Sequence, residues 1–483
     1  MTDDADAEIG RLAASLRRGS IVAAAGCGKT EQIARGVIVS GRRRLVLTHT
    51  HAGVDALTRR LKKHNVLSDK YRLDTIAGWC LRFAAAFPNR SGISAVEPKS
   101  TAEWDAVYAA AGKLIDSGAV DGVIASSYGG CFVDEYQDCT KHQHAVIQRL
   151  ANHLPTCVFG DPLQAIFDFR GQQPVDWNRD VFPTFIREGE LVTPWRWKNA
   201  GNLALAEWLQ TVRQAMENGS ALDLTTLPTG VTRIALPTDT RFQQGAIVRQ
   251  CLDSMGEAHL GNLIVIGDSK SANRRSALAQ KLAKQGFTNI EAVGCKEIFS
   301  AAKAIDSSNG VERFKALLQF AEKCMTGTNR TEFEKAVQAH QQGRRLGHAK
   351  FGVLLSLASA VITTGGDSDM LTFLDALQSR ADAHLYRREM FFAMRSALQV
   401  KATRQVGSLN DAIWDVQNRG RHIGRRLSNR SIGSTLLVKG LEFDRAVVLH
   451  SGAMSRKDWY VALTRATQRI RIISPQVRFT PGP

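Results

Sequence analysis

The sequence contains no hydrophobic run long enough to cross a membrane. A membrane-spanning helix needs about 18 or more consecutive apolar residues, and the longest apolar run, residues 352–364, is shorter and contains serine and threonine. The first residues, MTDDAD, are acidic and lack the apolar segment of a secretory signal. We therefore expect a cytoplasmic protein with no membrane partner.

Cysteine is sparse and shows no pattern. The chain has eight cysteines in 483 residues, with no CxxC pair and no alternation with histidine. This argues against a disulfide framework and a structural zinc site, and it favours reduced thiols. His142 and His144 flank Gln143, but without further metal ligands nearby we favour a surface helix there.

Composition excludes a disordered chain and indicates an acidic partner. Hydrophobic residues make up 44% and charged residues 23%, which is enough for two to four folded domains. The formal net charge is +17, and residues 401–483 hold 15 basic against 5 acidic residues, 15 − 5 = +10. Apolar runs interrupt that segment, so we favour a nucleic-acid face on a folded domain over an ordinary basic exterior.

Short apolar runs alternate with helical patterns, which predicts parallel α/β sheets. A mostly helical stretch, residues 83–128, interrupts the first sheet, and residues 311–409 interrupt the second. The predicted strands are residues 20–24, 44–48, 130–133, 156–159, 263–266, 435–438, 446–449 and 470–473. The first four end at Gly, Thr, Asp or His, where an open α/β sheet binds its ligands.

The strongest local motif is residues 23–30, AAAGCGKT, between a predicted strand and a predicted helix. Glycines allow backbone N–H groups to surround phosphate oxygens at a helix N-terminus, where the helix dipole favours anions. Lys29 would then contact the β- and γ-phosphates, and the Thr30 hydroxyl would contact Mg²⁺. Asp134 and Glu135 end the strand at residues 130–133, and such paired carboxylates can hold Mg²⁺ and polarise water.

Four further segments follow the loop in a recognisable order. They are residues 134–138 (DEYQD), 160–171 (GDPLQAIFDFRG), 439–444 (KGLEFD) and 460–466 (YVALTRA). They resemble the second, third, fifth and sixth motifs of UvrD/Rep-like superfamily 1A DNA helicases. The resemblance implies two RecA-like parallel-sheet P-loop motor domains, each with a mainly helical insertion, that use ATP and Mg²⁺.

The resemblance also assigns roles to residues at matching positions. Glu135 would orient the attacking water, Gln164 would sense the γ-phosphate, and Arg196 and Arg465 would stabilise charge on the transferred phosphoryl group. Thr30 and Asp134 would hold Mg²⁺. The residues implied in ATP binding are Ala25, Gly26, Cys27, Gly28, Lys29, Thr30 and Glu442. The upstream Leu-Asn-x-x-Gln segment that reads adenine in the family is absent.

Single-stranded DNA would lie along three segments of the chain. Aromatic side chains that stack on bases give sequence-tolerant affinity, although core packing is the alternative for each phenylalanine and a structural role is the alternative for His49. The implied DNA contacts are Thr48, His49, Thr75, Phe167, Phe169 and Arg170.

Motif positions define the expected domains. Residues 1–82 and 129–195 would form the first motor domain, with 83–128 as its helical insertion. Residues 196–310 and 425–483 would form the second, with 311–424 as its insertion.

We expect an ATP-dependent DNA helicase or translocase, moving 3′ to 5′ by analogy with the family, in DNA repair or anti-phage defence. A competing hypothesis is a DNA-binding ATPase subunit that regulates a partner nuclease, as in Gabija-type defence systems, with little unwinding of its own. A DNA-binding scaffold that uses ATP as a clamp signal would also fit the motifs. A basic P-loop kinase is disfavoured, because it leaves the motifs after Gln164 unexplained.

Overall fold

The computed structural model describes residues 2–94, 98, 100–167, 174–292, 294–404, 407–423 and 427–482. The chain divides into two compact units. The first comprises Met1–Leu222, Ser455–Gln468 and Pro483, and the second comprises Asp223–Met454 and Arg469–Gly482. The segment that carries the sixth motif is therefore part of the first unit, together with the phosphate-loop sequence.

The first unit contains a six-stranded sheet with the order β3-β2-β4-β5-β1-β6. All five neighbouring pairs are parallel. The strands are β1 (Arg18–Ala23), β2 (Arg44–Thr48), β3 (Tyr71–Thr75), β4 (Gly130–Val133), β5 (Thr156–Gly160) and β6 (Arg187–Leu191). Strands β1 and β4 are separated only by β5, so the loop after β1 and the carboxylates after β4 lie at the same edge of the sheet.

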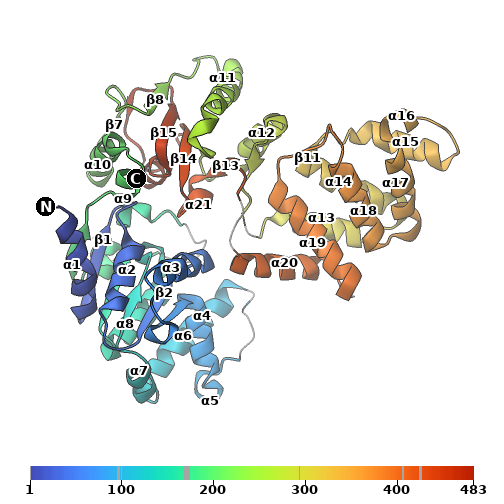
Figure 1. The fold of residues 1–483 in the computed structure, drawn as a ribbon. Helices are drawn as coiled ribbons and strands as arrows, with labels where there is room; N and C mark the ends of the chain where they lie inside the picture. The colour runs from blue at the N-terminus through green and yellow to red at the C-terminus, as the bar shows by residue number, and fades with distance from the viewer. Residues whose placement is uncertain are drawn as a thin grey trace. The chain divides into compact units, whose positions relative to one another are not determined.

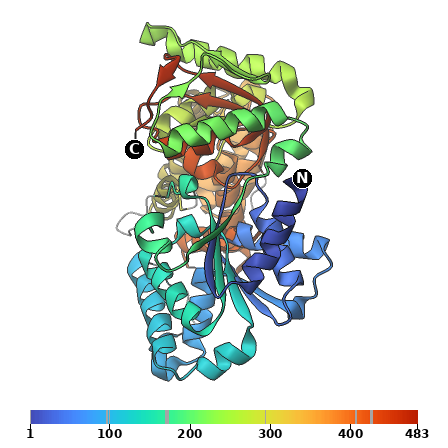
Figure 2. The same ribbon diagram turned by 90° about the vertical axis from the view of Figure 1, so that its left-hand side faces the viewer.

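Helices cover both faces of this sheet (Figures 1 and 2). Alternate strand residues enter different cores: Val46 and Phe132 pack with α1, α2 and α3, whereas Leu45 and Leu47 pack with α4, α6 and α8. This period of two is what a sheet buried on both sides requires. The helices of the unit are α1 (Thr2–Ser15), α2 (Lys29–Ile38), α3 (His51–Lys63), α4 (Ile76–Ala85), α5 (Pro88–Ser91), α6 (Thr101–Asp116), α7 (Asp121–Ser127), α8 (Lys141–His153), α9 (Trp195–Asn199), α10 (Leu203–Glu217) and α22 (Arg456–Leu463).

The second unit is built on another six-stranded sheet, with the order β10-β13-β9-β14-β15-β8. Strand β9 pairs in parallel with both β13 and β14. The strands are β8 (Val231–Ile234), β9 (Leu263–Gly267), β10 (Thr288–Asn289), β13 (Arg430–Ser434), β14 (Phe443–Leu449) and β15 (Ala466–Ile473). Helices α11 (Thr240–Asp253) and α12 (Ala272–Lys281) belong to this part of the unit. The predicted α/β fold class with two parallel sheets is confirmed.

One predicted strand, residues 435–438, is wrong. These residues form the short helix α21 (Thr435–Val438), and the strand, β13, lies immediately before it. The Ser434 side chain caps the helix by accepting a hydrogen bond from the Leu437 N–H at 3.4 Å. The apolar pair Leu436 and Leu437 suggested a strand, but the cap redirects the chain at Ser434.

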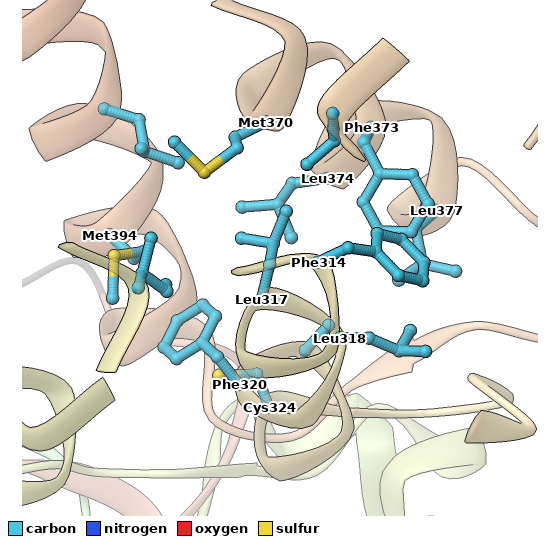
Figure 3. Packing of buried hydrophobic residues seen from close by; sticks show 14 of the residues in the cluster. Phe314, Leu317, Leu318, Phe320, Cys324, Met370, Phe373, Leu374, Leu377 and Met394 are labelled. Carbon is cyan, nitrogen blue, oxygen red and sulfur yellow. The ribbon is translucent and has the colours of Figure 1, made fainter. Parts of the chain in front are cut away.

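A helical region of the second unit has a core of its own (Figure 3). Phe314 and Phe373 have ring centroids 5.2 Å apart in an edge-to-face arrangement, and both rings are buried, at 1% and 0% exposure. The helices are α13 (Lys296–Asp306), α14 (Gly310–Cys324), α15 (Arg330–Gln341), α16 (His348–Phe351), α17 (Val353–Thr364), α18 (Asp367–Gln378), α19 (Arg388–Arg404) and α20 (Leu409–Ile423). Two short strand pairs, β11 (Met325–Thr326) with β12 (His384–Leu385) and β7 (Leu222–Asp223) with β16 (Arg478–Phe479), complete the fold.

Among the described residues, no helix combines the length and apolar character that a membrane span requires.

Candidate nucleotide site

The loop between β1 and α2 has the backbone geometry of a phosphate-binding loop. Gly26 and Gly28 have φ values of 73° and 83°, a left-handed conformation that glycine adopts without steric cost. Gly28 caps α2, which begins at Lys29. The free N–H groups of the first turn therefore face the end of the loop, where an anion is favoured. Thr30 lies half-buried in the same first turn.

The loop rests against helix α9. The Arg196 backbone N–H donates to the Gly26 carbonyl at 3.1 Å. A methyl group on Gly26 would lie 2.8 Å from the Cβ of Arg196 and 2.9 Å from the Trp197 ring. Gly26 is thus required both for its backbone conformation and for this close approach. Ala25 and Cys27 are buried in the loop, and burial raises the pKa of the Cys27 thiol to about 12, so it remains neutral.

Lys29 points toward the paired carboxylates. Its Nζ lies 3.7 Å from Oε1 of Glu135, and the lysine is only 9% exposed. Burial opposes the charged ammonium, but Glu135, Asp161 and Asp134 outweigh it and raise the pKa of Lys29 above its ordinary value. The site therefore holds a permanent cation beside the phosphate loop.

The two carboxylates have different environments. Asp134 is 4% exposed, and burial together with the adjacent Glu135 raises its pKa to about 7. Glu135 is more exposed, with a third of its side-chain surface accessible, and its φ of 54° is unusual for a residue other than glycine. Such a conformation costs of the order of 1–3 kcal/mol and is typical of functional positions.

Amide side chains connect Glu135 to the end of β5. The Gln137 amide donates to Oε2 of Glu135, and its carbonyl accepts from the Asp161 backbone N–H at 3.0 Å. The Gln164 amide then donates to Oδ2 of Asp161 at 2.9 Å. Gln164 is 5% exposed. The expected water-orienting and phosphate-sensing residues therefore belong to one hydrogen-bonded chain.

Arg196 and Arg465, the two arginines expected to stabilise phosphoryl charge, both contact Thr464. Arg196 donates to the Thr464 carbonyl at 2.9 Å, and Arg465 donates to the Thr464 hydroxyl at 2.9 Å. Arg465 also donates to the Gln164 side-chain oxygen at 3.4 Å. Its side chain is 1% exposed, so its charge is held inside the protein beside the sensor.

Two residues that the motif argument did not assign complete the arrangement. Tyr460 of α22 accepts a hydrogen bond from the Ala25 backbone N–H at 3.1 Å. Arg213 of α10 donates to the Tyr460 hydroxyl at 2.9 Å and to Oδ1 of Asp161 at 2.9 Å. Both line a cavity of about 300 Å³ beside the loop, which Cys27, Trp197 and Thr464 also line.

The donor set fits a divalent cation. The Thr30 hydroxyl and the Asp134 carboxylate are oxygen ligands of the kind that Mg²⁺ prefers. The raised pKa of Asp134 reflects a buried negative charge that a bound cation would stabilise. Among the described residues, no group of three or more histidine, cysteine or acidic side chains could hold a metal ion. His142 contacts Asp105 at 2.8 Å, and His144 contacts the Tyr136 hydroxyl at 2.7 Å.

Comparison with known proteins finds a family similarity in one segment of the chain. Residues 107–179 match the model of the UvrD/REP helicase N-terminal domain. Over these residues the chain is similar to the UvrD/REP helicase N-terminal domain. The matched residues include Asp134, Glu135 and Gln164, and the resemblance drawn from the motifs is confirmed. None of the curated proteins compared with the chain matches its sequence significantly.

Several solved structures of viral helicases resemble the chain weakly. The arterivirus nonstructural protein 10 helicase in complex with DNA aligns at 11% identity with a TM-score of 0.37, covering 97% of this chain and 64% of that one. The same helicase without DNA gives 10% identity, a TM-score of 0.36 and coverages of 97% and 63%. The PRRSV helicase aligns at 11% identity with a TM-score of 0.35, covering 96% of this chain and 54% of that one. This chain thus spans less than two thirds of their length, and likeness at this level does not define its activity.

Two of the expected DNA contacts, Thr48 and Thr75, lie at the ends of neighbouring strands. Thr48 and Thr75 are paired across β2 and β3, and both are buried, at 1% and 5% exposure. Thr75 caps α4 by accepting from the Gly78 N–H at 2.9 Å. His49 contacts the Cys139 sulfur at 3.3 Å, and Phe167 is half-buried.

The remaining expected residues lie elsewhere. Phe169 and Arg170 are outside the described residues. Glu442 is exposed, just before β14 in the second unit, and the contacts described above all lie in the first unit.

Sequence reasoning missed Asp161, Gln137, Arg213 and Tyr460 as site residues. The first two and Tyr460 stand inside recognised motifs, so proximity to the motifs was an available signal. No sequence signal marked Arg213, because it lies within an amphipathic helix with no motif around it.

Proposed function

We propose that this chain is an ATP-dependent DNA helicase or translocase that works with Mg²⁺. One observation carries the proposal. Lys29 opens the helix after a glycine loop and lies 3.7 Å from Glu135, while Gln164 and Arg465 meet at 3.4 Å. Phosphoryl transfer needs such positioned positive charge and a water-orienting carboxylate more than it needs covalent chemistry.

The residues divide the work by their chemistry. The loop N–H groups and Lys29 bind and orient the phosphates, and Glu135 accepts the proton of the attacking water. Arg196 and Arg465 stabilise negative charge that develops on the transferred group, and Gln164 connects Arg465 to Asp161. Thr30 and Asp134 would hold Mg²⁺, which would supply charge neutralisation at the phosphates.

Charge supports a nucleic-acid substrate. The net charge of +17 favours a polyanion, and the family resemblance makes single-stranded or tailed DNA our choice. Thr48, His49, Thr75, Phe167, Phe169 and Arg170 are the proposed contacts, and the motor-domain boundaries drawn from the motifs are part of this proposal. By the same analogy we propose 3′ to 5′ movement in DNA repair or anti-phage defence.

The test measures ATP turnover and strand displacement together. Wild-type protein and Lys29→Ala are assayed with Mg²⁺, with and without single-stranded DNA, over a range of salt concentrations. We expect DNA-stimulated turnover in the wild type only, with DNA affinity falling steeply as salt rises. Turnover that survives Lys29→Ala contradicts the proposed site.

Strand displacement on a duplex with a 3′ tail distinguishes a helicase from a regulatory ATPase. Release of the strand that depends on ATP hydrolysis is expected of a helicase. DNA-stimulated ATP hydrolysis without release, even on a duplex with a 5′ tail, would instead indicate an ATPase subunit that regulates a partner such as a nuclease. Turnover that DNA does not change contradicts both.

A further inference from the structure

Arg213 connects two parts of the nucleotide site through a single nitrogen. Its Nη1 donates to Oδ1 of Asp161 at 2.9 Å and to the hydroxyl of Tyr460 at 2.9 Å. The arginine lies on α10, outside every recognised motif. Its side chain is 11% exposed, and the Asp161 side chain is fully buried.

Each partner of Arg213 touches a group that we assign to phosphate recognition. Tyr460 accepts the Ala25 N–H of the phosphate loop at 3.1 Å. The second oxygen of Asp161 accepts the Gln164 amide at 2.9 Å. A continuous chain of hydrogen bonds therefore runs from the loop backbone through Arg213 to the proposed γ-phosphate sensor.

Ionic interactions reinforce this series of hydrogen bonds. Burial opposes the charge on Arg213, but Asp161 and Glu217 outweigh it and raise the pKa of the guanidinium above its ordinary value. Removing one partner of a buried charged pair leaves the other charge uncompensated, which is strongly unfavourable. The guanidinium also lies over the Tyr460 ring, 5.5 Å from its centroid, which restricts the ring and its hydroxyl.

We propose that Arg213 is a positioning residue of the nucleotide site, acting through Tyr460 on the Ala25 N–H and through Asp161 on Gln164. It fixes the distance between loop and sensor, so that both meet the transferred phosphoryl group at once. This proposal rests on the proposed ATP hydrolysis. It assigns Arg213 no contact with the nucleotide.

A positioning role affects turnover more than binding. Nucleotide affinity depends mainly on Lys29 and on the N–H groups at the start of α2, and Arg213 reaches the loop only indirectly, at Ala25 through Tyr460. Alignment of Gln164 matters only in the transition state. For Arg213→Met we expect kcat for ATP hydrolysis to fall at least tenfold, with KM within about threefold of the wild type. Tyr460→Phe removes only the bridge to Ala25 and is expected to lower kcat about three- to tenfold.

The experiment compares Arg213→Met, Arg213→Lys and Tyr460→Phe in the full chain with Mg²⁺ and single-stranded DNA. Each rate is divided by the concentration of sites that bind a fluorescent ATP analogue, so that loss of folded protein does not register as loss of kcat. One nitrogen makes both contacts, so a lysine ammonium can replace it, and Arg213→Lys is expected to recover most of the lost kcat. Glu207→Gln, an exposed charge change on α10, is the control.

Three results overturn the proposal. They are an unchanged kcat in both Arg213→Met and Tyr460→Phe, a rise in KM with constant kcat, or a lysine variant as slow as the methionine variant. If Arg213→Met does not fold, Tyr460→Phe decides alone, because phenylalanine preserves the ring. A wild type without ATP turnover would overturn the proposed function. The role of Arg213 alone would be overturned if the wild type turns over ATP, Lys29→Ala abolishes this turnover, and Tyr460→Phe and Arg213→Met leave it unaffected.

Discussion

The ammonium group of Lys29 lies 3.7 Å from the Glu135 carboxylate, across the edge of the first sheet. The lysine starts the helix after β1, and the glutamate follows β4. The intervening strand β5 sets their separation. The two side chains form an ion pair, so a bound phosphate would share Lys29 with Glu135.

Glu135→Gln is expected to separate nucleotide binding from turnover. The amide cannot accept the proton of the attacking water, but it removes a negative charge from beside the phosphates. We expect ATP turnover to fall at least 100-fold while affinity for a fluorescent ATP analogue is unchanged or higher. Lys29→Ala is the matched comparison and is expected to lose both ATP turnover and affinity for the ATP analogue. Loss of nucleotide binding in Glu135→Gln would show that its carboxylate holds the loop rather than the water.

Gly26→Ala is expected to damage the loop on steric grounds. Its φ of 73° disfavours a side chain, and the new methyl group would lie 2.8 Å from the Cβ of Arg196. We expect the free energy of unfolding to fall by about 1–3 kcal/mol, with weaker ATP binding. Gly41→Ala is the control, since a methyl group there meets no atom within 4 Å. Equal denaturation midpoints for the two variants would contradict this account.

His144 is expected to make stability depend on pH. The histidine is 6% exposed, and burial lowers its pKa below the ordinary value of 6.5, although Asp180 partly opposes this. Below about pH 6.5 the unfolded chain binds a proton that the folded chain does not. The free energy of unfolding should therefore fall as pH falls, by up to about 1.4 kcal/mol per pH unit until the folded pKa is reached.

Urea unfolding between pH 5 and 8 measures this slope. His144→Gln is expected to flatten it, and His142→Gln, whose side chain is 58% exposed, is expected to leave it unchanged. The slope is the relevant quantity, because losing the contact with the Tyr136 hydroxyl also lowers stability at every pH. A wild-type slope retained in His144→Gln would assign the effect to another group.

The helical core of the second unit offers a test of packing. Phe373 is fully buried and contacts the rings of Phe314 and Phe333, with centroids 5.2 and 5.9 Å away. Phe373→Ala is expected to lower the free energy of unfolding by about 3–5 kcal/mol in the transition that includes this region. Val353→Ala, at a site 69% exposed, should change it by less than about 0.5 kcal/mol. Similar losses in both variants would contradict the observed packing.

Local pattern was sufficient for the central elements of the fold. Strand β2 lies at residues 44–48 and β4 at residues 130–133, as predicted, because buried parallel strands are continuous apolar runs bounded by turn residues. Polar strands escaped prediction. Strand β6 has the sequence REGEL and lies at the edge of the sheet with mostly exposed side chains, so it carries no such run.

Functional motifs made of residues close together in the sequence could also be predicted. The loop at residues 23–30 is one continuous segment, and Asp134 and Glu135 are adjacent in a second. The residue types and spacing within each segment already indicate phosphate and Mg²⁺ binding. The sequence by itself thus predicted the kind of site and most of the residues that the structure brings together there.

Only the tertiary structure decided how these residues are held. Ala25 and Tyr460 are 435 positions apart, and Arg213 and Asp161 are 52 apart. No local pattern encodes such pairs, because they form only when α10 and α22 pack beside the sheet. The physical reason is the cost of burial: a charge such as Arg213 is stable inside the protein only where folding supplies its acceptors.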